Sequence, residues 1–240
     1  TQYGQMTAGS FMYIGPQGIV HGTTITILNA SRMLKNDSNE IKLFVSSGLG
    51  GMSGAQAKAA KIAGLNSITA EVNKKAIQKR FDQGWIDEII SNLNLLVRRI
   101  KDAKEGREIV SIGFYGNIVD VWEKFDEENI FINIGSDQTS LHNPFNGGYY
   151  PVGMSFQESN KLIRKNPTLF KKLVQKSLKK QVQLINKHTK RGTYFFDYGN
   201  AFLLEAGRAK ANIFDENGKF RYPSYVQDIM GPLCFDYGFG

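Results

Sequence analysis

A glycine-rich turn is the segment of this sequence best suited to bind a phosphate. The stretch Gly48-Leu49-Gly50-Gly51-Met52-Ser53-Gly54 follows an apolar run that predicts a buried strand and leads into an Ala- and Lys-rich run that predicts a helix. Glycine lets the backbone turn tightly and approach a pyrophosphate, and free N–H groups at a helix start favour negative charge. Gly48 and Gly50 match the first two positions of the dinucleotide-binding fingerprint, whereas Ser53 stands where the third glycine is expected.

An acidic residue follows at the spacing that a ribose contact requires. Glu71 lies about twenty residues further on, at the end of the next predicted strand, where a carboxylate can accept hydrogen bonds from a ribose 2′-hydroxyl. A 2′-phosphate would be repelled there, so Glu71 favours NAD over NADP. At this point a glycine-rich turn without any ligand remains the alternative.

Polar residues also cluster where three other predicted strands end. The clusters are Tyr115-Gly116-Asn117, the stretch 135–142, and Asp197-Tyr198-Gly199-Asn200. Ligands of open α/β sheets bind outside the carboxyl ends of the strands, so these clusters predict one binding edge. Ordinary turn and helix-cap chemistry is the alternative. Asp137 could orient His142 for acid–base work, but ligand contact is the favoured role. Scattered histidines and a single cysteine, Cys234, predict no metal site.

The alternation of strands and helices predicts an α/β fold with a parallel sheet that is covered on both faces. The predicted strands are 41–45, 67–70, 109–114, 130–134 and 194–196. The predicted helices are 53–63, 74–81, 85–104, 118–126, 200–211, and a pair whose second member is 167–187. Segment 21–34 also predicts a helix, although its Thr and Ile residues would suit a strand.

Composition excludes several classes of protein. The net charge is +8 over 240 residues, but the lysines concentrate between Lys161 and Arg191, where they interleave with an apolar stripe at helical spacing. No nucleic-acid motif accompanies them, so nucleic acid is rejected as a partner. No apolar run is long enough for a membrane span, and no signal peptide is visible. A single thiol suits a reducing cytoplasm. The absence of an initiator Met suggests a start inside a longer gene product.

Long strings of this sequence resemble the urocanase family. They are 3–10, 13–23, 47–56, 135–144, 147–151, 186–189, 196–206 and 221–232, and the resemblance spans essentially the whole chain. It implies a Rossmann-like α/β domain that belongs to a cytoplasmic, homodimeric enzyme of histidine degradation. That enzyme adds water to urocanate and yields imidazolone propionate, with tightly held NAD⁺ acting as an electrophile.

The resemblance also implies which residues contact NAD. In addition to Gly50 of the turn, they are Gln5, Gly51, Met52, Ser53, Glu71, Asn117, Ile118, Gln138, Thr139, Ser140, Leu141, His142, Tyr149, Tyr150 and Tyr198. Two departures matter. Ala76 stands where some members have an Arg, and Gly147-Gly148 is one glycine longer than in some members, which could shift the assignment of the two tyrosines by one.

The resemblance further implies that residues 1–240 form one NAD-binding domain of a longer urocanase. Segments 1–18 and 222–240 are then expected to pack toward a core domain outside this chain. The family's essential cysteine is expected outside the chain too, and Cys234 does not match it, so no catalytic residue is assigned and the domain alone is expected to be inactive. A hydride-transferring dehydrogenase is disfavoured because no Tyr-x-x-x-Lys pair occurs. A nucleotide-binding module without activity is the other alternative.

Overall fold

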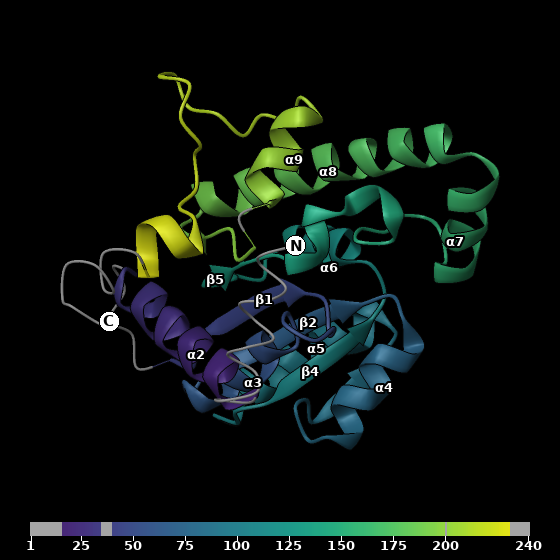
Figure 1. The fold of residues 1–240 in the computed structure, drawn as a ribbon. Helices are drawn as coiled ribbons and strands as arrows, with labels where there is room; N and C mark the ends of the chain where they lie inside the picture. Colours follow the sequence, from purple (N-terminus) through teal and green to yellow (C-terminus); the bar gives the residue numbers. More distant parts are fainter. Residues whose placement is uncertain (1–15, 35–39, 200, 231–240) are drawn as a thin grey trace.

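A parallel sheet between two layers of helices organises the molecule. The computed structural model describes residues 16–34, 40–199 and 201–230. Within this part of the chain the sheet has six strands in the order β3-β4-β2-β1-β5-β6, and all the pairings are parallel (Figure 1). The predicted Rossmann-like α/β class is therefore confirmed.

The order of the strands reverses beside β1. The strands are β1 (Leu43–Ser47), β2 (Asn66–Glu71), β3 (Glu88–Ile90), β4 (Ser111–Tyr115), β5 (Ile134–Gly135) and β6 (Tyr194–Phe195). On one side of β1 lie β2, β4 and the edge strand β3, with β4 inserted between β2 and β3 although it follows β3 in the sequence. The chain then places β5 and β6 on the other side of β1. The crevice that such a reversal opens at the carboxyl ends of the strands is where open α/β sheets bind their ligands.

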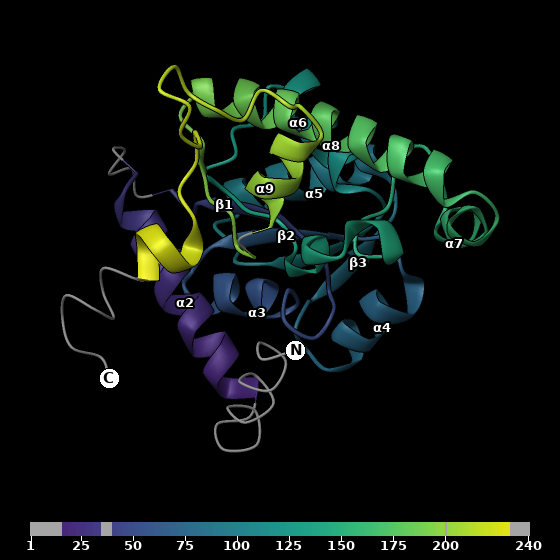
Figure 2. The ribbon, with the colours of Figure 1, turned by 45° about the horizontal axis from the view of Figure 1, so that its top comes forward.

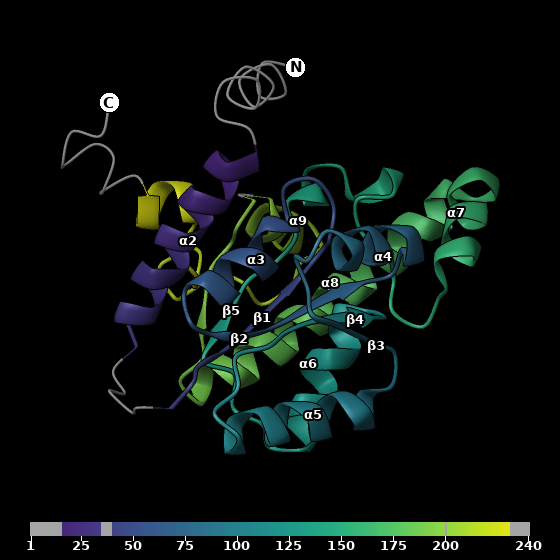
Figure 3. The ribbon, with the colours of Figure 1, turned by 90° about the horizontal axis from the view of Figure 1, so that it is seen from below.

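Helices cover both faces of the sheet. One layer holds α2 (Pro16–Arg32), α3 (Ala55–Ile62) and α4 (Lys74–Asp82), and the opposite layer holds α5 (Leu93–Glu105), α6 (Ile118–Glu127) and α8 (Pro167–Lys190) (Figures 2 and 3). The shorter α7 (Phe156–Lys165) precedes α8, and α9 (Phe202–Arg208) packs against it. The 3₁₀ turns η1 (Thr139–His142) and η2 (Pro144–Asn146) follow β5, and the π-helix η3 (Tyr225–Met230) lies beside α2.

The apolar patterns seen in the sequence become the core. The stripe in the lysine-rich segment lies along α8, where Phe170, Val174 and Leu178 are fully buried in the main core cluster. Trp122 of α6 is buried in the same cluster and packs edge-on against Phe195 of β6. Burial of large side chains such as these contributes about 1.5–3 kcal/mol each to folding.

The single long helix predicted for 85–104 is wrong. The segment holds edge strand β3 and helix α5, and Asn92 separates them because its side chain accepts a hydrogen bond from the Leu95 N–H and so caps α5. Asp87 accepts the Ser111 N–H in front of β3 and thereby ties this strand to β4. The isoleucines on both sides of the break share a helical period by coincidence, and periodicity cannot separate a three-residue strand from a helical turn.

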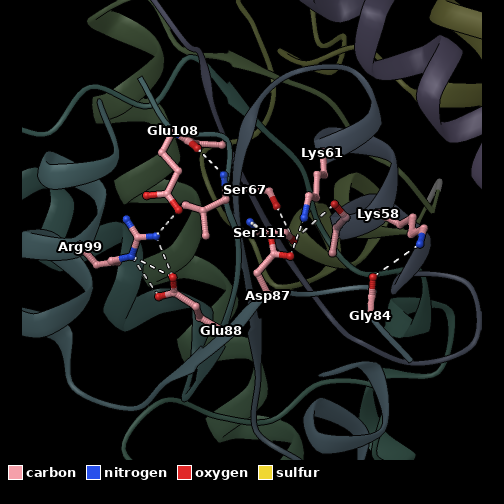
Figure 4. A network of polar contacts seen from close by, with 12 residues as sticks. Lys58, Lys61, Ser67, Gly84, Asp87, Glu88, Arg99, Glu108 and Ser111 are labelled. Carbon is pink, nitrogen blue, oxygen red and sulfur yellow. Dashed lines mark hydrogen bonds and ion pairs between the residues drawn. The ribbon is translucent and has the colours of Figure 1, made fainter. Parts of the chain in front are cut away.

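Charged side chains fasten this edge strand at the amino ends of the strands. Arg99 of α5 binds Glu88 at the start of β3 and Glu108 before β4, with nitrogen–oxygen distances of 2.7 and 2.9 Å (Figure 4). Lys61 of α3 binds Asp87 from the opposite layer at 2.5 Å. The network lies at the sheet edge opposite to the carboxyl ends, so it serves the fold rather than a ligand.

Two other segments show how side chains resolve ambiguous patterns. Residues 21–32 of the segment 21–34 lie in a helix, α2, in which Thr23, Thr24 and Thr26 each donate to the carbonyl four residues earlier. The strand predicted at 130–134 shrinks to Ile134–Gly135, because the Asn133 side chain accepts the Leu43 N–H and replaces a strand-to-strand bond. In the described part of the chain, no helix is long and apolar enough to cross a membrane.

Candidate functional site

A cavity of about 310 Å³ lies at the carboxyl edge of the sheet, beside the reversal of strand order. The glycine-rich turn after β1, the end of β2, the start of α6 and the loop after β5 form its walls. Its lining residues are Ser47, Gly48, Gly50, Gly51, Met52, Ser53, Ala70, Glu71, Val72, Asn73, Ala76, Gly116, Asn117, Ile118, Gln138, Thr139, Ser140, Gly147, Gly148, Tyr149, Tyr150 and Phe156. Residues of the polar clusters after β4 and β5 therefore meet at this cavity, as the sequence predicts, whereas Asp197, Tyr198 and Gly199 of the third cluster are not among its lining residues.

The glycine-rich turn presents unused N–H groups to this cavity. Helix α3 begins at Ala55, two residues later than the sequence predicts, and its first hydrogen bonds reach back only from Gly54 onward. Within the described residues, the N–H groups of 50–53 bind no protein acceptor. Four free donors at the amino end of a helix form an arrangement that binds phosphate oxygens.

Gly48 is required by the shape of the turn. Its φ angle is +84°, a conformation that L side chains rarely adopt, and a Cβ there would lie 3.0 Å from Cβ atoms of both Gln138 and Ser53. Gly50 and Gly51 differ, because a Cβ on either would meet no atom within 4 Å. The first glycine therefore shapes the turn, while the next two keep the space in front of it open.

Glu71 forms the wall at the end of β2 and also holds the turn. One carboxylate oxygen accepts the Leu49 N–H at 2.8 Å, and the other accepts the Asn73 N–H at 2.8 Å. Burial raises the pKa of Glu71, while the backbone N–H groups of Leu49 and Asn73 act in the opposite direction. Each oxygen keeps a lone pair, so the carboxylate can still accept a ribose hydroxyl.

Hydrogen bonds join the turn to the loop after β5. The Ser53 hydroxyl accepts the Thr139 N–H at 2.9 Å and lies 2.9 Å from the Thr139 hydroxyl. Side chains of Gln138 and Ser140 both donate to the Gly148 carbonyl. Gly148 must be glycine, because a Cβ there would lie 2.1 Å from the Ser140 carbonyl oxygen. These bonds hold the two loops that enclose the cavity as one unit.

Asn117 and Tyr150 complete the wall between α6 and α7. The Asn117 side chain caps α6 by accepting the Val119 N–H, and its amide donates to the Tyr150 carbonyl at 2.9 Å. The Tyr150 ring packs against Phe156, with ring centroids 5.0 Å apart. The Asn117 side chain therefore fixes both the start of α6 and the position of Tyr150 in the cavity wall.

The structure brings twelve of the sixteen predicted cofactor-binding residues to this cavity. They are Gly50, Gly51, Met52, Ser53, Glu71, Asn117, Ile118, Gln138, Thr139, Ser140, Tyr149 and Tyr150. Gln5 lies outside the described residues. Among the other three, Leu141 is fully buried in the core, and His142 is exposed with a ring nitrogen 2.7 Å from the Thr139 carbonyl oxygen. His142 is thus held by a main-chain carbonyl, and orientation by Asp137 is wrong.

Tyr198 and Tyr149 occupy positions that sequence alone does not reveal. The Tyr198 hydroxyl lies 2.7 Å from that of Thr23, so this side chain joins the segment after β6 to α2 and is not among the residues that line the cavity. The Tyr149 side chain is buried and donates to Gln181 of α8, which leaves mainly its main chain for the cavity. Asn73 and Phe156 also line the cavity, but the sequence does not predict them as ligand contacts, because a helix cap and an aromatic residue at the start of α7 carry no specific spacing.

Comparison with known proteins decides the family. A protein-family model described as the urocanase Rossmann-like domain matches residues 15–229. The chain belongs to the urocanase family. The probable urocanate hydratases of Caenorhabditis elegans and Dictyostelium discoideum are each 57% identical to it over 245 residues, and the urocanate hydratase of Mus musculus is 53% identical over 249 residues. These matches cover 100% of this chain but only 36–37% of each relative.

A Rossmann-like urocanase domain is a nucleotide-binding fold, which agrees with the cavity at the strand ends. Ala76, at the position where the resemblance implies an Arg in some members, lies in the cavity wall, where its methyl group offers no charge. No group of three His, Cys, Asp or Glu side chains that could hold a metal ion occurs in the described residues.

Two buried carboxylates lie beneath the loop that follows β5 of this urocanase domain. Asp137 and Asp197 are both fully buried. Asp137 accepts the Tyr198 N–H at 2.7 Å through one oxygen, while Asp197 accepts the N–H groups of Gly199 and Leu203. Burial, together with the neighbouring charge of Asp197, raises the pKa of Asp137 well above its ordinary value. The pair links the ends of β5 and β6.

This raised pKa predicts a pH-dependent stability. An unfolded aspartate ionises near pH ~3.9, whereas the folded protein keeps the Asp137 proton to higher pH, so the free energy of unfolding falls as pH rises between the two values. Asp137→Asn keeps the acceptor for Tyr198 and removes the charge. We expect it to raise the free energy of unfolding at pH 8 by about 1–3 kcal/mol and to have less effect at pH 4.

Urea unfolding of the wild type and the variant across pH 4–8 measures this difference. Asp102→Asn, at an exposed position on α5, is the matched control and should leave the pH profile unchanged. Parallel profiles for wild type and Asp137→Asn would show that Asp137 is not the group that couples folding to pH.

Proposed function

We propose that this chain is the NAD-binding domain of a urocanate hydratase, an enzyme that adds water to urocanate and yields imidazolone propionate. The observation that carries the proposal is the row of free N–H groups at 50–53, which faces a cavity at the reversal of strand order and has Glu71 in its wall. The printed names of the relatives supply the reaction, since they are urocanate hydratases.

The residues of the cavity suit NAD. The N–H groups of the turn would bind the diphosphate, and Glu71 would accept the hydroxyls of the adenosine ribose. Gln138, Thr139 and Ser140, on the β5 side of the reversal, would hold the nicotinamide half. When bound, NAD⁺ would supply an electrophilic ring for the substrate imidazole. The chain's own residues would bind and orient this cofactor. The loop after β5, which hydrogen bonds from Gln138 and Ser140 to the Gly148 carbonyl hold together, would shield it from water.

Residues 1–240 serve in this proposal as a single domain of the enzyme. Urocanate is the substrate of the whole enzyme, which acts as a cytoplasmic homodimer, and the segments at both ends of this chain, 1–18 and 222–240, contact its core domain. Neither nucleic acid nor a membrane is a partner in this proposal. Gln5, Leu141, His142 and Tyr198 remain proposed NAD contacts beside the twelve residues in the cavity wall.

Titration calorimetry with NAD⁺ tests the proposal directly. We expect one site per chain and weaker binding of NADP⁺, because the 2′-phosphate would approach the Glu71 carboxylate. An adjoining cavity carries Lys74, Lys75 and Lys79, which could favour a phosphate, so the NADP⁺ titration is a stringent comparison. Failure of both dinucleotides to bind would sink the proposal.

Glu71→Ala should weaken NAD⁺ binding by about 1–3 kcal/mol, because a ribose hydroxyl loses a charge-assisted partner and the turn loses its tie to Leu49. The same change should narrow the preference for NAD⁺ over NADP⁺. Calorimetry with NAD⁺ and NADP⁺ on the wild type and on Glu71→Ala provides the measurement. Asp87→Ala, at the amino ends of the strands, is the control for removal of a structural carboxylate. An unchanged NAD⁺ dissociation constant would exclude Glu71 as the ribose ligand.

A further inference from the structure

A buried arginine lies directly behind the glycine-rich turn. Arg80 of α4 is only 8% exposed, although α4 is a surface helix. Its Nε donates to the Leu49 carbonyl at 3.1 Å and its Nη2 to the Gly50 carbonyl at 2.5 Å, while Nη1 donates to Gln83 at 2.7 Å. The guanidinium also stacks on Trp85, 4.2 Å from the ring centroid. Every nitrogen of this side chain is therefore engaged, and two of them hold the turn.

The turn itself is shaped to admit this guanidinium. A Cβ at Gly54 would lie 2.8 Å from the Arg80 Nε and 2.8 Å from the Gly50 carbonyl oxygen. Real Cβ atoms essentially never come this close to another atom, so a larger residue at 54 would displace Arg80 or the Gly50 peptide. The last glycine of the turn thus makes room for the arginine.

Arg80 fixes the direction in which the turn presents its donors. In a planar trans peptide the C=O and the following N–H point in opposite directions. Because the carbonyls of Leu49 and Gly50 point at Arg80, the N–H groups of Gly50 and Gly51 point away from it. Both residues line the cavity, and neither N–H has a protein acceptor in the described chain. The Leu49 N–H is held separately by Glu71.

Arg80 also brings an uncompensated charge to the site. Within the described residues no carboxylate forms an ion pair with it, in contrast to Arg99, which binds both Glu88 and Glu108. Burial accordingly lowers the pKa of Arg80. An anion in front of the turn would offset this charge through the peptide dipoles that Arg80 itself aligns.

We infer that Arg80 is a positioning residue for the diphosphate of the bound dinucleotide: it clamps the carbonyls of 49 and 50 so that the N–H groups of the turn face the ligand, and it supplies the positive charge behind them. The inference rests on the proposed NAD binding and adds the residue that makes the turn selective for the phosphates. Arg80 need not touch the ligand.

The test compares ligands with and without phosphates. Calorimetry with NAD⁺, ADP and adenosine is run on the wild type, Arg80→Met, Arg80→Lys and the control Arg99→Met. Arg80→Met should weaken NAD⁺ and ADP binding about 10- to 100-fold while adenosine changes less than about threefold, because only the first two carry the diphosphate. Arg80→Lys, which keeps the charge but not the fork, should lie between the wild type and Arg80→Met. Arg99→Met should bind like the wild type.

Salt dependence and amide spectra separate this role from a purely structural one. ADP binding by the wild type should weaken with salt, and the slope should fall in Arg80→Met but persist in Arg80→Lys. On addition of ADP, the ¹⁵N–¹H signals of Gly50 and Gly51 should shift in the wild type and in Arg80→Lys. If Arg80→Met does not fold, the comparison of Arg80→Lys with the wild type tests the inference. Equal losses of ADP and adenosine binding in Arg80→Lys would overturn it.

The outcomes distinguish the two proposals. A wild type that binds NAD⁺ together with an Arg80→Met variant that binds it equally well overturns the role of Arg80 and leaves the proposed function intact. A wild type that binds neither NAD⁺ nor ADP overturns both. Equal weakening of all three ligands assigns Arg80 to the fold alone.

Discussion

Gly50→Val is expected to reduce NAD⁺ binding at least about 100-fold while the protein stays folded. A Cβ at position 50 meets no atom within 4 Å, and its φ angle is not positive, so the folded chain can accept the new side chain. The open space in question is the front of the turn, where the free N–H groups face the cavity. A β-branched side chain there would keep the diphosphate out of reach of these donors.

Calorimetry with NAD⁺ and thermal unfolding of the same samples provide the measurement. Gly50→Ala should give a smaller loss, because a single methyl group blocks less of the approach. Gly106→Val, at the end of α5, places the same side chain at the opposite sheet edge and should leave binding unchanged. A folded Gly50→Val variant with a dissociation constant within threefold of the wild type would show that the diphosphate binds elsewhere.

Urocanate is expected to remain unchanged when this chain is saturated with NAD⁺. In the described part of the chain, the titratable side chains that line the cavity are Glu71, Tyr149 and Tyr150, and all three are already engaged by the protein. None is left as a paired acid and base for the addition of water. Without groups that orient urocanate and water, the activation barrier stays higher, because proximity and orientation can lower it by about 7–11 kcal/mol.

The assay follows loss of urocanate absorbance, with the full-length urocanate hydratase of Mus musculus as the positive control. NAD⁺ occupancy of this chain is verified by calorimetry beforehand, so that inactivity cannot be mistaken for an empty site. We expect turnover lower than that of the control by several orders of magnitude. Comparable turnover would mean that these 240 residues contain the whole active site.

The parts of the fold that sequence could predict are those with long, regular patterns. The apolar stripe of α8 repeats one period along the helix, and the glycines after β1 mark the turn between a strand and a helix, so local sequence determines both structures. Edge strand β3 is three residues long, and its hydrogen-bond partner β4 lies twenty residues further on, so only tertiary pairing reveals it. The shortened β5 depends on one side chain, Asn133, whose partner is Leu43.

The sequence predicts the parts of the site whose main chain or carboxylate would contact the ligand. It does not predict the side chains that act only through contacts with other side chains or with the turn. Glycine spacing and Glu71 marked the turn and its wall because their chemistry requires a fixed distance along the chain. Arg80 carried no such signal, since a basic residue in a surface helix usually faces water. Its burial depends on the turn, thirty residues earlier, and on Trp85, and those contacts exist only in the folded chain.

The stacking of Arg80 on Trp85 gives the protein an optical probe of its own. Of the two tryptophans, Trp122 is sealed in the core, whereas Trp85 is half-buried and touches the guanidinium that holds the turn. Indole emission shifts with the polarity and charge around the ring, and a core indole emits at shorter wavelength than a partly hydrated one. An anion that binds to the turn and displaces it would therefore change the longer-wavelength emission of Trp85. This change can be followed without a label in a stopped-flow fluorescence experiment.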